Sequence, residues 1–206
     1  MTLEKYWQIV NSVLYYIIDI MKIILSGGEY MKKVKGFTLI EMIIVLAIIG
    51  ILGGILIPSW MNYIANSKIK KQNENAKIIF NAAQTVAQDY KFYERKLKAD
   101  EKILGDGDFY FYCDHGDGDV SDNAGNIITL STNQLKASPN FNDDFAEKIN
   151  KIFSDSDETV YFIHINNYMV ESVVSGRSDN DLYLGSYPDK QTERNGGTNT
   201  VFSLIK

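Results

Sequence analysis

The sequence predicts an α+β protein in which one long N-terminal helix packs on a four-stranded antiparallel sheet. Residues 37–98 are first apolar throughout and then amphipathic, with apolar residues at three- and four-residue steps, as in a helix. Residues 158–206 instead hold short stretches rich in β-branched and aromatic residues, separated by turn formers. A helix followed by such a run of strands is typical of α+β architecture.

The first part of the helix, residues 37–58, has the composition of a membrane segment. Residues 37–57 contain 21 residues with a single charge, Glu41. A helix of that length crosses about 30 Å of hydrocarbon. Lysines within 32–35 stand directly before it, and the positive-inside tendency keeps that end cytoplasmic. We therefore expect everything after Trp60 to lie outside.

Helix-weakening residues mark the end of this segment. Gly53 and Gly54 each cost about 1 kcal/mol relative to Ala, and Pro58 costs about 3 kcal/mol. We expect a kink near Pro58 and a section that can unwind within an assembly. The amphipathic half, residues 59–98, should cover a globular part through an apolar stripe of Ala76, Phe80, Ala83, Ala87, Tyr90, Tyr93 and Leu97.

A turn-rich region, residues 99–140, follows the helix, with a short strand predicted at 108–113. Its acids Asp117, Asp119 and Asp122 allow two interpretations. Closely spaced carboxylates can bind calcium, although their spacing departs from the usual calcium loop. Asp and Gly are also ordinary turn residues, which favours an acidic surface loop.

The last region, residues 141–206, reads as a short helix and then strands. The helix is predicted at 141–153. The four strands of the sheet are predicted at 158–166, 168–176, 181–187 and 200–206, with Asn166-Asn167 as a hairpin turn. The polar loop 188–199 lies before the last strand. Since the chain has one cysteine, no intrachain disulfide can close this loop, and we expect it to be held by strand pairing or by a metal.

Charge and composition exclude several functions. The net charge is −5, and without residues 1–36 the remaining 16 basic and 23 acidic residues give −7. Nucleic-acid binding needs Lys and Arg on phosphates, so we expect no nucleic-acid partner. Cys113 and His115 are close in sequence without assured contact, and His164 is expected to be a satisfied strand residue. No nucleophile–base pair or phosphate loop is present, so we expect no enzyme and no cofactor.

The stretch KKVKGFTLIEMIIVLAIIGILGGILIP resembles the leader and N-terminal helix of type IV pilins and pseudopilins. The matching features are Gly36, Phe37, Thr38-Leu39-Ile40, Glu41 and Pro58. The resemblance covers about 30 residues; the rest matches by architecture alone. It implies the pilin fold, with the 37–58 helix in the core of a filament.

The resemblance also implies processing. A prepilin peptidase would cleave between Gly36 and Phe37 and methylate the new amine of Phe37. That amine is positive, so Glu41 of an incoming subunit can neutralise it and set the assembly register; the alternative is an acid at the membrane interface without a partner. The implied partners are other pilin subunits, the peptidase, the pilus assembly platform and, before assembly, the cytoplasmic membrane.

Three related roles stay open at this point. The leading one is a pilin in a cell-surface fimbrium used for adhesion or motility. The others are a pseudopilin of a secretion or DNA-uptake machine and a minor adhesive tip pilin. Residues 1–36 are the leader, and residues 1–30 are expected to be untranslated, with Met31 as the start. Codons for Gly27-Gly28 can form a ribosome-binding sequence shortly before the Met31 codon.

Overall fold

The computed structural model describes residues 39–105, 107–195, 197 and 199–205, together with Tyr15, Asp19 and Lys22. The chain divides into two compact units, residues 1–63 and 64–206. We call the second unit the head, and each unit is described by itself. The expected start at Met31 and the cleavage site Gly36–Phe37 lie outside the described residues.

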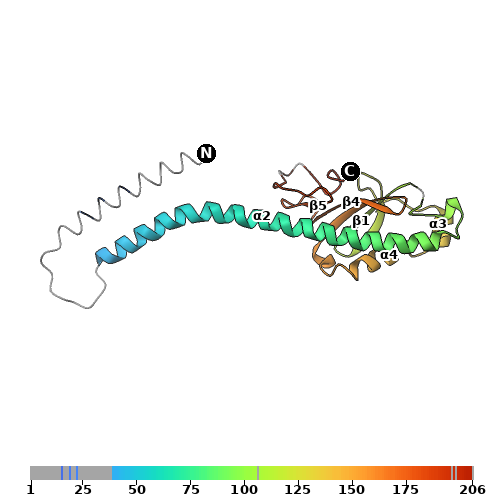
Figure 1. Cartoon of the computed structure of the whole chain (residues 1–206), viewed down its shortest axis with the longest axis horizontal. Helices are drawn as coiled ribbons and strands as arrows, with labels where there is room; N and C mark the ends of the chain where they lie inside the picture. The colour runs from blue at the N-terminus through green and yellow to red at the C-terminus, as the bar shows by residue number, and fades with distance from the viewer. Residues whose placement is uncertain are drawn as a thin grey trace. The chain divides into compact units, whose positions relative to one another are not determined.

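Helix α2, Leu39–Glu94, is a single element that contributes to both units (Figure 1). It remains helical through Gly53, Gly54 and Pro58, so the unwinding expected there concerns an assembly and stays a prediction. The expected end at residue 98 is wrong. The chain leaves the helix at Glu94, where Leu97 N donates to Glu94 O at 3.2 Å, and a short 3-10 helix, η1 (Ala99–Glu101), follows.

Within the head, α2 turns one stripe toward the core. The predicted stripe is confirmed at four positions and fails at its end: Ala76, Ala83, Ala87 and Tyr90 are buried, whereas Tyr93 is exposed. Phe80 and Leu97 are half-buried. The stripe continues through Glu94 instead of Tyr93, because Glu94 is drawn inward by hydrogen bonds described below.

The sheet has five antiparallel strands in the order β2-β1-β3-β4-β5. Their bounds are β1 Asp108–Asp114, β2 Asp117–Ser121, β3 Val160–Asn166, β4 Met169–Gly176 and β5 Gly185–Tyr187. The predicted α+β class, a long helix on an antiparallel sheet, is therefore confirmed, with five strands where four were expected.

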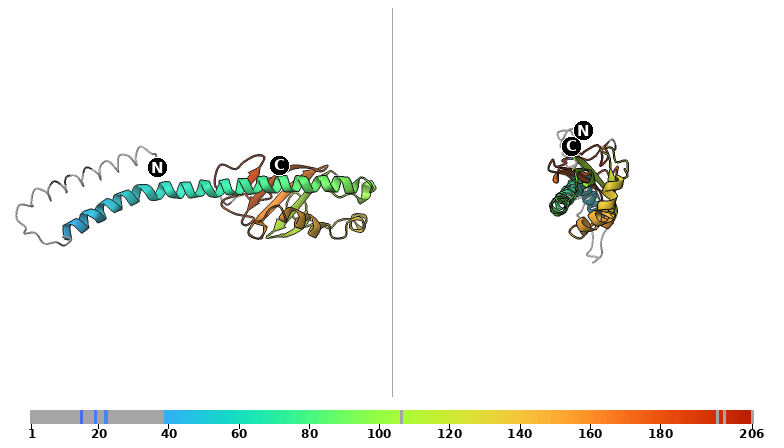
Figure 2. Two further views of the ribbon diagram at one scale, coloured as in Figure 1. Left: turned by 60° about the horizontal axis from the view of Figure 1, so that its bottom comes forward. Right: turned by 90° about the vertical axis from the view of Figure 1, so that its right-hand side faces the viewer.

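The two faces of the sheet are covered by different elements (Figures 1 and 2). Phe111 and Ile163 face a core shared with α2 and with helix α4, Phe141–Asn150. On the other face, Phe162 packs in a second cluster with Val201 and Phe202 of the C-terminal segment. The alternation of strand residues thus buries both faces of the sheet.

The strand predicted at 200–206 is wrong, because this segment forms turns. Ser203 N donates to Thr200 O at 3.2 Å, and Thr200 N donates to Ser203 Oγ at 2.8 Å. Such local bonds compete with strand pairing. The apolar residues that suggested a strand instead cover the outer face of the sheet.

Strand β2 was expected to be part of a loop. It pairs with β1 from Tyr110↔Ser121 to Asp114↔Asp117. Its Gly118 admits the ring of Phe111, since an added Cβ would lie 2.3 Å from that ring. The Asp and Gly residues that predict turns therefore occupy an edge strand in which only Val120 and Ser121 are buried.

Smaller corrections concern turns and helix ends. The β3–β4 turn is centred on Asn167 and Tyr168, one residue later than predicted, and both have positive φ, as a two-residue hairpin of type I′ requires. Helix α4 ends at Asn150 rather than 153. Helix α3, Thr132–Ala137, was missed although Ser131 and Gln134 form a capping box, a signal visible in the sequence.

Candidate functional site

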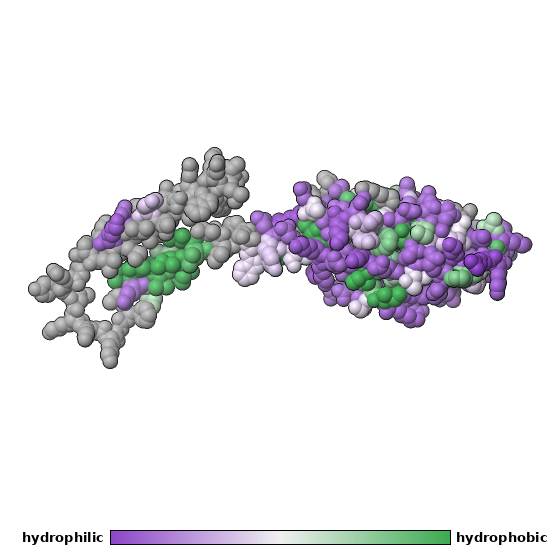
Figure 3. Space-filling view, viewed as in Figure 1, coloured by the Kyte–Doolittle hydropathy of each residue, from purple (hydrophilic) through white to green (hydrophobic). Residues whose placement is uncertain are grey.

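In the described part of the first unit, residues 39–63, most of the described side chains are apolar and exposed. Leu39, Trp60 and Tyr63 are 82%, 66% and 73% exposed. Figure 3 shows a hydrophobic area, in green, on the described side chains of part of this segment, whereas the head is mostly hydrophilic. Exposed apolar area of this extent marks a surface that another molecule or a lipid phase covers.

Among the described residues, no helix combines the length and the apolarity needed to cross a membrane.

Glu41 is the only charged residue of this exposed segment, and it lies in the first turn of α2. The helix dipole favours a negative charge at that position, because the amide N–H groups of the first turn have no partner within the helix. A neighbouring positive group would add to this effect. The first turn of a helix therefore suits a carboxylate.

The glycines of the same segment have open space around them among the described residues. A Cβ added to Gly50 or Gly54 would meet nothing within 4 Å, and one added to Gly53 would only touch Ile57 at 4.0 Å. Their backbone is helical, and each Gly there costs about 1 kcal/mol relative to Ala. Small residues on an exposed apolar helix let other helices approach closely.

A buried carboxylate holds the other end of α2 in the head. Glu94 is 1% exposed. Its Oε1 accepts from Ile103 N at 3.0 Å and Leu104 N at 3.3 Å, and its Oε2 accepts from the Tyr168 hydroxyl at 2.8 Å. Glu94 thus connects α2, the segment after η1 and the β3–β4 turn. This role could not be recognised from the sequence, because a glutamate next to Arg95 is typical of a solvent-exposed helix residue.

Tyr168 completes this cluster. Its carbonyl accepts from Gln84 Nε2 at 3.0 Å and Gln88 Nε2 at 3.2 Å, and Gly105 leaves the space that its ring occupies. Burial, followed by the hydrogen bond to Glu94, raises the pKa of the Tyr168 hydroxyl. These bonds offset the strain of a non-glycine residue at φ 68°.

Side-chain amides hold the described part of the loop expected at 188–199. Asn73 of α2 donates through Nδ2 to Gln191 O at 2.8 Å, and its Oδ1 accepts from Ser186 N at 3.0 Å and Gln191 N at 3.1 Å. Asn195 is also buried and donates to Asp181 O at 3.0 Å. Two asparagine amides therefore tie this loop to the helix and to the preceding segment.

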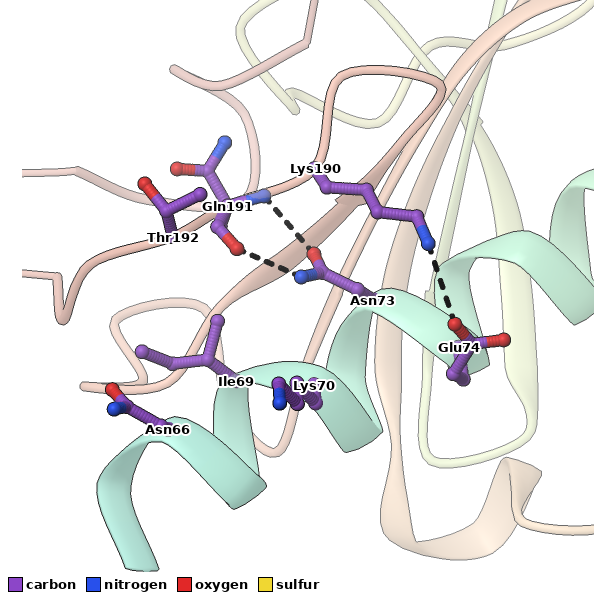
Figure 4. A pocket seen from close by; sticks show the side chains of 8 residues that line it. All are labelled: Asn66, Ile69, Lys70, Asn73, Glu74, Lys190, Gln191 and Thr192. Carbon is purple, nitrogen blue, oxygen red and sulfur yellow. Dashed lines mark hydrogen bonds and ion pairs between the residues drawn. The ribbon is translucent and has the colours of Figure 1, made fainter. Parts of the chain in front are cut away.

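An open pocket of about 630 Å³ lies between this loop and α2 (Figure 4). Asn73 and Gln191 close one side of it, and Lys190 Nζ lies 3.4 Å from Glu74 Oε1 across it. Its polar groups are largely engaged with one another, which gives it the features of a surface depression rather than of a ligand site.

Replacing Asn73 with alanine should loosen this loop. The substitution leaves two backbone N–H groups and one carbonyl without partners, at about 1–3 kcal/mol for each buried group, so we expect a loss of about 2–3 kcal/mol. Limited proteolysis should cut residues 188–195 much faster. Asn66→Ala, which changes an exposed residue of the same pocket, is the control; equal cutting rates in the two variants would contradict the role of Asn73.

The three candidate calcium ligands have protein partners. Asp119 Oδ1 accepts from Asn142 Nδ2 at 2.9 Å. Asp122 accepts from Ala124 N at 2.8 Å and Asn126 N at 2.9 Å, and its bonds with Asn126 are the main reason why its pKa lies below the usual value. Asp117 is exposed at the start of β2.

Over the described ranges, no group of three or more His, Cys, Asp or Glu side chains is arranged to hold a metal. Calcium binding by the three aspartates stays a prediction, which a calcium titration of the melting temperature tests.

Cys113, His115 and His164 lie in three different surroundings. Cys113 faces the core, where burial raises the pKa of its thiol. His115 is exposed in the β1–β2 turn and bonds to Asp114 through Nδ1. His164 lies in β3 with Nε2 at 2.9 Å from Asp108 Oδ1, a satisfied strand histidine as predicted.

The N-terminal segment is similar to those of known proteins. A family model described as a prokaryotic N-terminal methylation motif matches residues 31–57. The chain is 45% identical over 71 residues to a type IV major fimbrial protein, FimA, of Dichelobacter nodosus, covering 34% of this chain and 41% of the relative. It is 41% identical over 61 residues to a fimbrial protein of Pseudomonas aeruginosa, covering 30% of this chain and 40% of the relative.

A third relative is the type IV major pilin protein PilA of Myxococcus xanthus, 45% identical over 58 residues, 28% of this chain and 26% of the relative. The chain thus spans less than half the length of these relatives. No solved structure matches it. The chain thus carries a prokaryotic N-terminal methylation motif, is similar to type IV fimbrial proteins over its N-terminal part, and has the long helix on an antiparallel sheet that the pilin fold predicts.

Proposed function

We propose that the protein is a structural subunit of a type IV pilus, processed between Gly36 and Phe37, methylated at Phe37 and assembled through the apolar half of α2. The exposed apolar surface of residues 39–63, directly after the methylation motif, carries this proposal. Burying such a surface between copies is favourable by about 25 cal/mol per Å² of apolar area. A helical bundle of these segments would form the core of the filament.

The glycines support close packing in that core. Gly50 and Gly54 lower helix stability, and among the described residues an added Cβ would meet nothing within 4 Å, so we attribute their benefit to contacts between subunits or to local unwinding in the filament. In either case the assembled state, and not the single chain, explains why glycine stands there.

Glu41 supplies the register. A carboxylate within apolar surroundings costs about 2.5–3.5 kcal/mol at the centre of a membrane helix and less near its end. Pairing with the methylated Phe37 amine of a neighbouring subunit offsets that cost in one stagger only. The carboxylate then selects the correct arrangement of adjacent helices.

The partners follow from this role. Before assembly, the 37–58 segment anchors the chain in the cytoplasmic membrane, where the prepilin peptidase and the pilus assembly platform act on it. Afterwards the subunit lies in a cell-surface filament. The role is structural and not catalytic; in support, Cys113 is buried while His115 is exposed and bonded to Asp114.

Intact-mass and N-terminal analysis of fibres sheared from cells tests the proposal. A mature chain that begins at N-methyl-Phe37 and is abundant in the sheared fraction would support a major pilin. A chain with the same start found only in membranes would indicate a pseudopilin or a minor tip pilin. An uncleaved chain that retains Gly36 would overturn the filament role.

Replacing Glu41 with glutamine should separate processing from assembly. We expect cleavage after Gly36 to continue and the yield of sheared fibres to fall about tenfold or more, since losing 1.4 kcal/mol of pairing is a tenfold effect. Immunoblots of the membrane and sheared fractions measure both. Asn62→Ala, at an exposed polar position of the same unit, is the control. Unchanged fibre yield in the Glu41→Gln variant would refute the register role.

A further inference from the structure

The end of α2 carries a concentration of positive charge that the acidic composition of the head conceals. Lys91, Arg95, Lys96 and Lys98 are all exposed. Glu94, the one acid between them, is 1% exposed and bonded inward to Ile103 N and the Tyr168 hydroxyl. Every exposed charged side chain of residues 91–98 is therefore positive. We call these residues the basic tip. The acids that follow, Asp100 and Glu101, are bonded to Asn133 Nδ2 and Lys98 N.

The basic tip also exposes aromatic surface. Phe92 is 64% exposed and Tyr93 51% exposed, and the guanidinium of Arg95 lies 5.0 Å from the centre of the Phe92 ring. An exposed aromatic residue among cations, with an arginine stacked on it, has the composition of the centre of a protein–protein interface. Within the described chain the head itself leaves this surface uncovered.

An acidic surface lies at the other end of the same unit. Asp114 and Asp117 flank the β1–β2 turn, and Asp157 and Glu158 lie in η2, Ser156–Glu158; all four are exposed. The turn and η2 are adjacent, since a Cβ on Gly116 would lie 3.4 Å from Asp157 Oδ1. Asn150 Nδ2 donates to Gly116 O at 3.0 Å, which places the end of α4 and the exposed Ile152 nearby. We call these four acids the acidic corner.

The two surfaces are at opposite ends of the head. Lys71 Nζ lies 3.3 Å from Asp155 Oδ2, which places the segment before η2 beside the Lys71 turn of α2. Lys91 lies 20 residues further along the helix, about 30 Å away at 1.5 Å per residue. The course of strand β1 also places the two surfaces at opposite ends. It begins at Asp108, after the Glu94 cluster, and ends at Asp114 in the acidic corner.

We propose that the basic tip of one head docks onto the acidic corner of the head of a second copy of this chain. Surfaces of opposite charge at opposite ends of one subunit make a heterologous contact, which repeats from copy to copy into a filament instead of closing into a dimer. Complementary potential fixes register and orients encounter, and the exposed Phe92 and Ile152 supply apolar area at the two surfaces. This inference rests on the proposed function and adds a head-to-head contact to the helix core.

A charge-swap experiment in cells tests the contact. We expect R95E/K96E and D157K/E158K each to reduce sheared-fibre yield about tenfold or more, and the combined four-substitution chain to recover to within about threefold of wild type. The control K77E/R177E changes net charge as R95E/K96E does, at exposed positions outside both surfaces, and should assemble normally. Trypsin resistance of the head shows that each variant folds.

Other outcomes would overturn the proposal. One is a combined variant whose fibre yield is no higher than that of either two-substitution variant. A second is an R95E/K96E chain that assembles like wild type. Another is an R95E/K96E chain that yields normal fibres which no longer retain labelled single-stranded DNA bound by wild-type fibres; the tip would then bind a polyanion. Wild-type fibres containing the Phe37-start chain must be present in every case. If they are missing, the proposed function fails; if they are present without rescue, only the head contact fails.

Discussion

Replacing Glu94 with alanine should destabilise the head by about 3–5 kcal/mol or unfold the part of it that contacts the Glu94 end of α2. The variant leaves three buried donors without an acceptor: Ile103 N, Leu104 N and the Tyr168 hydroxyl. Each unsatisfied buried group costs about 1–3 kcal/mol, and the lost side chain also leaves a cavity. Since a typical domain is stable by about 5–15 kcal/mol, this is a large fraction of the total. Urea unfolding of the full chain in detergent, followed by far-UV circular dichroism, measures it.

Glu94→Gln is the matched control for this prediction. Its amide oxygen can still accept from the two backbone N–H groups, and its amide nitrogen can donate to the Tyr168 hydroxyl, so most of the stability should remain. Tyr168→Phe removes one of the three bonds and should lie between the two Glu94 variants. If Glu94→Ala were as stable as Glu94→Gln, the buried carboxylate would not be the element that holds these three segments together.

Replacing Gly185 with valine should detach strand β5 from α2. A Cβ at this position would lie 2.1 Å from the Gln72 carbonyl carbon and 2.3 Å from Asn73 N. Both atoms are helix backbone, so the strand has to move away. That movement breaks the bonds from Ser186 N to Asn73 and from Ser175 Oγ to Gln72 O. We expect a loss of about 3 kcal/mol or more, because overpacking and lost hydrogen bonds add together.

Hydrogen exchange of the β4 and β5 amides, together with urea unfolding, measures the effect of the Gly185 variant. Ser186→Ala on the same strand is the control, since it adds no atoms and keeps the Ser186 N bond to Asn73. Protection of β5 in Gly185→Val equal to that in the control would show that the strand and the helix backbone have room to separate without cost.

The N-terminal segment could be predicted from sequence because its signals are local. A leader, an apolar run and one acid at a defined position are recognisable without any contact between distant residues, and the methylation motif matches at residues 31–57. The amphipathic half of α2 was also predictable, since its period reports which side will be buried. Its end was not, because the inward turn of Glu94 depends on Ile103, Leu104 and Tyr168.

The segments at the edge and on the outer face of the sheet could not be predicted from local sequence patterns. The stretch at 200–206 has apolar residues suited to a strand, yet it packs across the outer face of the sheet, where Phe202 contacts the rings of Phe162 and Tyr112. Strand β2 has the composition of a turn, yet it pairs with the edge of β1, and its Gly118 leaves space for the ring of Phe111. In both cases a neighbouring element decides whether the backbone bonds are made within the segment or across the sheet.

The sequence alone determined the fold class, the motif and the apolar surface of residues 39–63, because each depends on residue type and spacing along the chain. Tertiary structure alone decided how the head is held together and where its charges lie. Glu94 and Asn73 became internal clamps, since buried backbone groups far along the chain needed acceptors and donors at those two positions. With Glu94 turned inward, the cations of residues 91–98 remain on the surface, so the charge of that end follows from folding and not from composition.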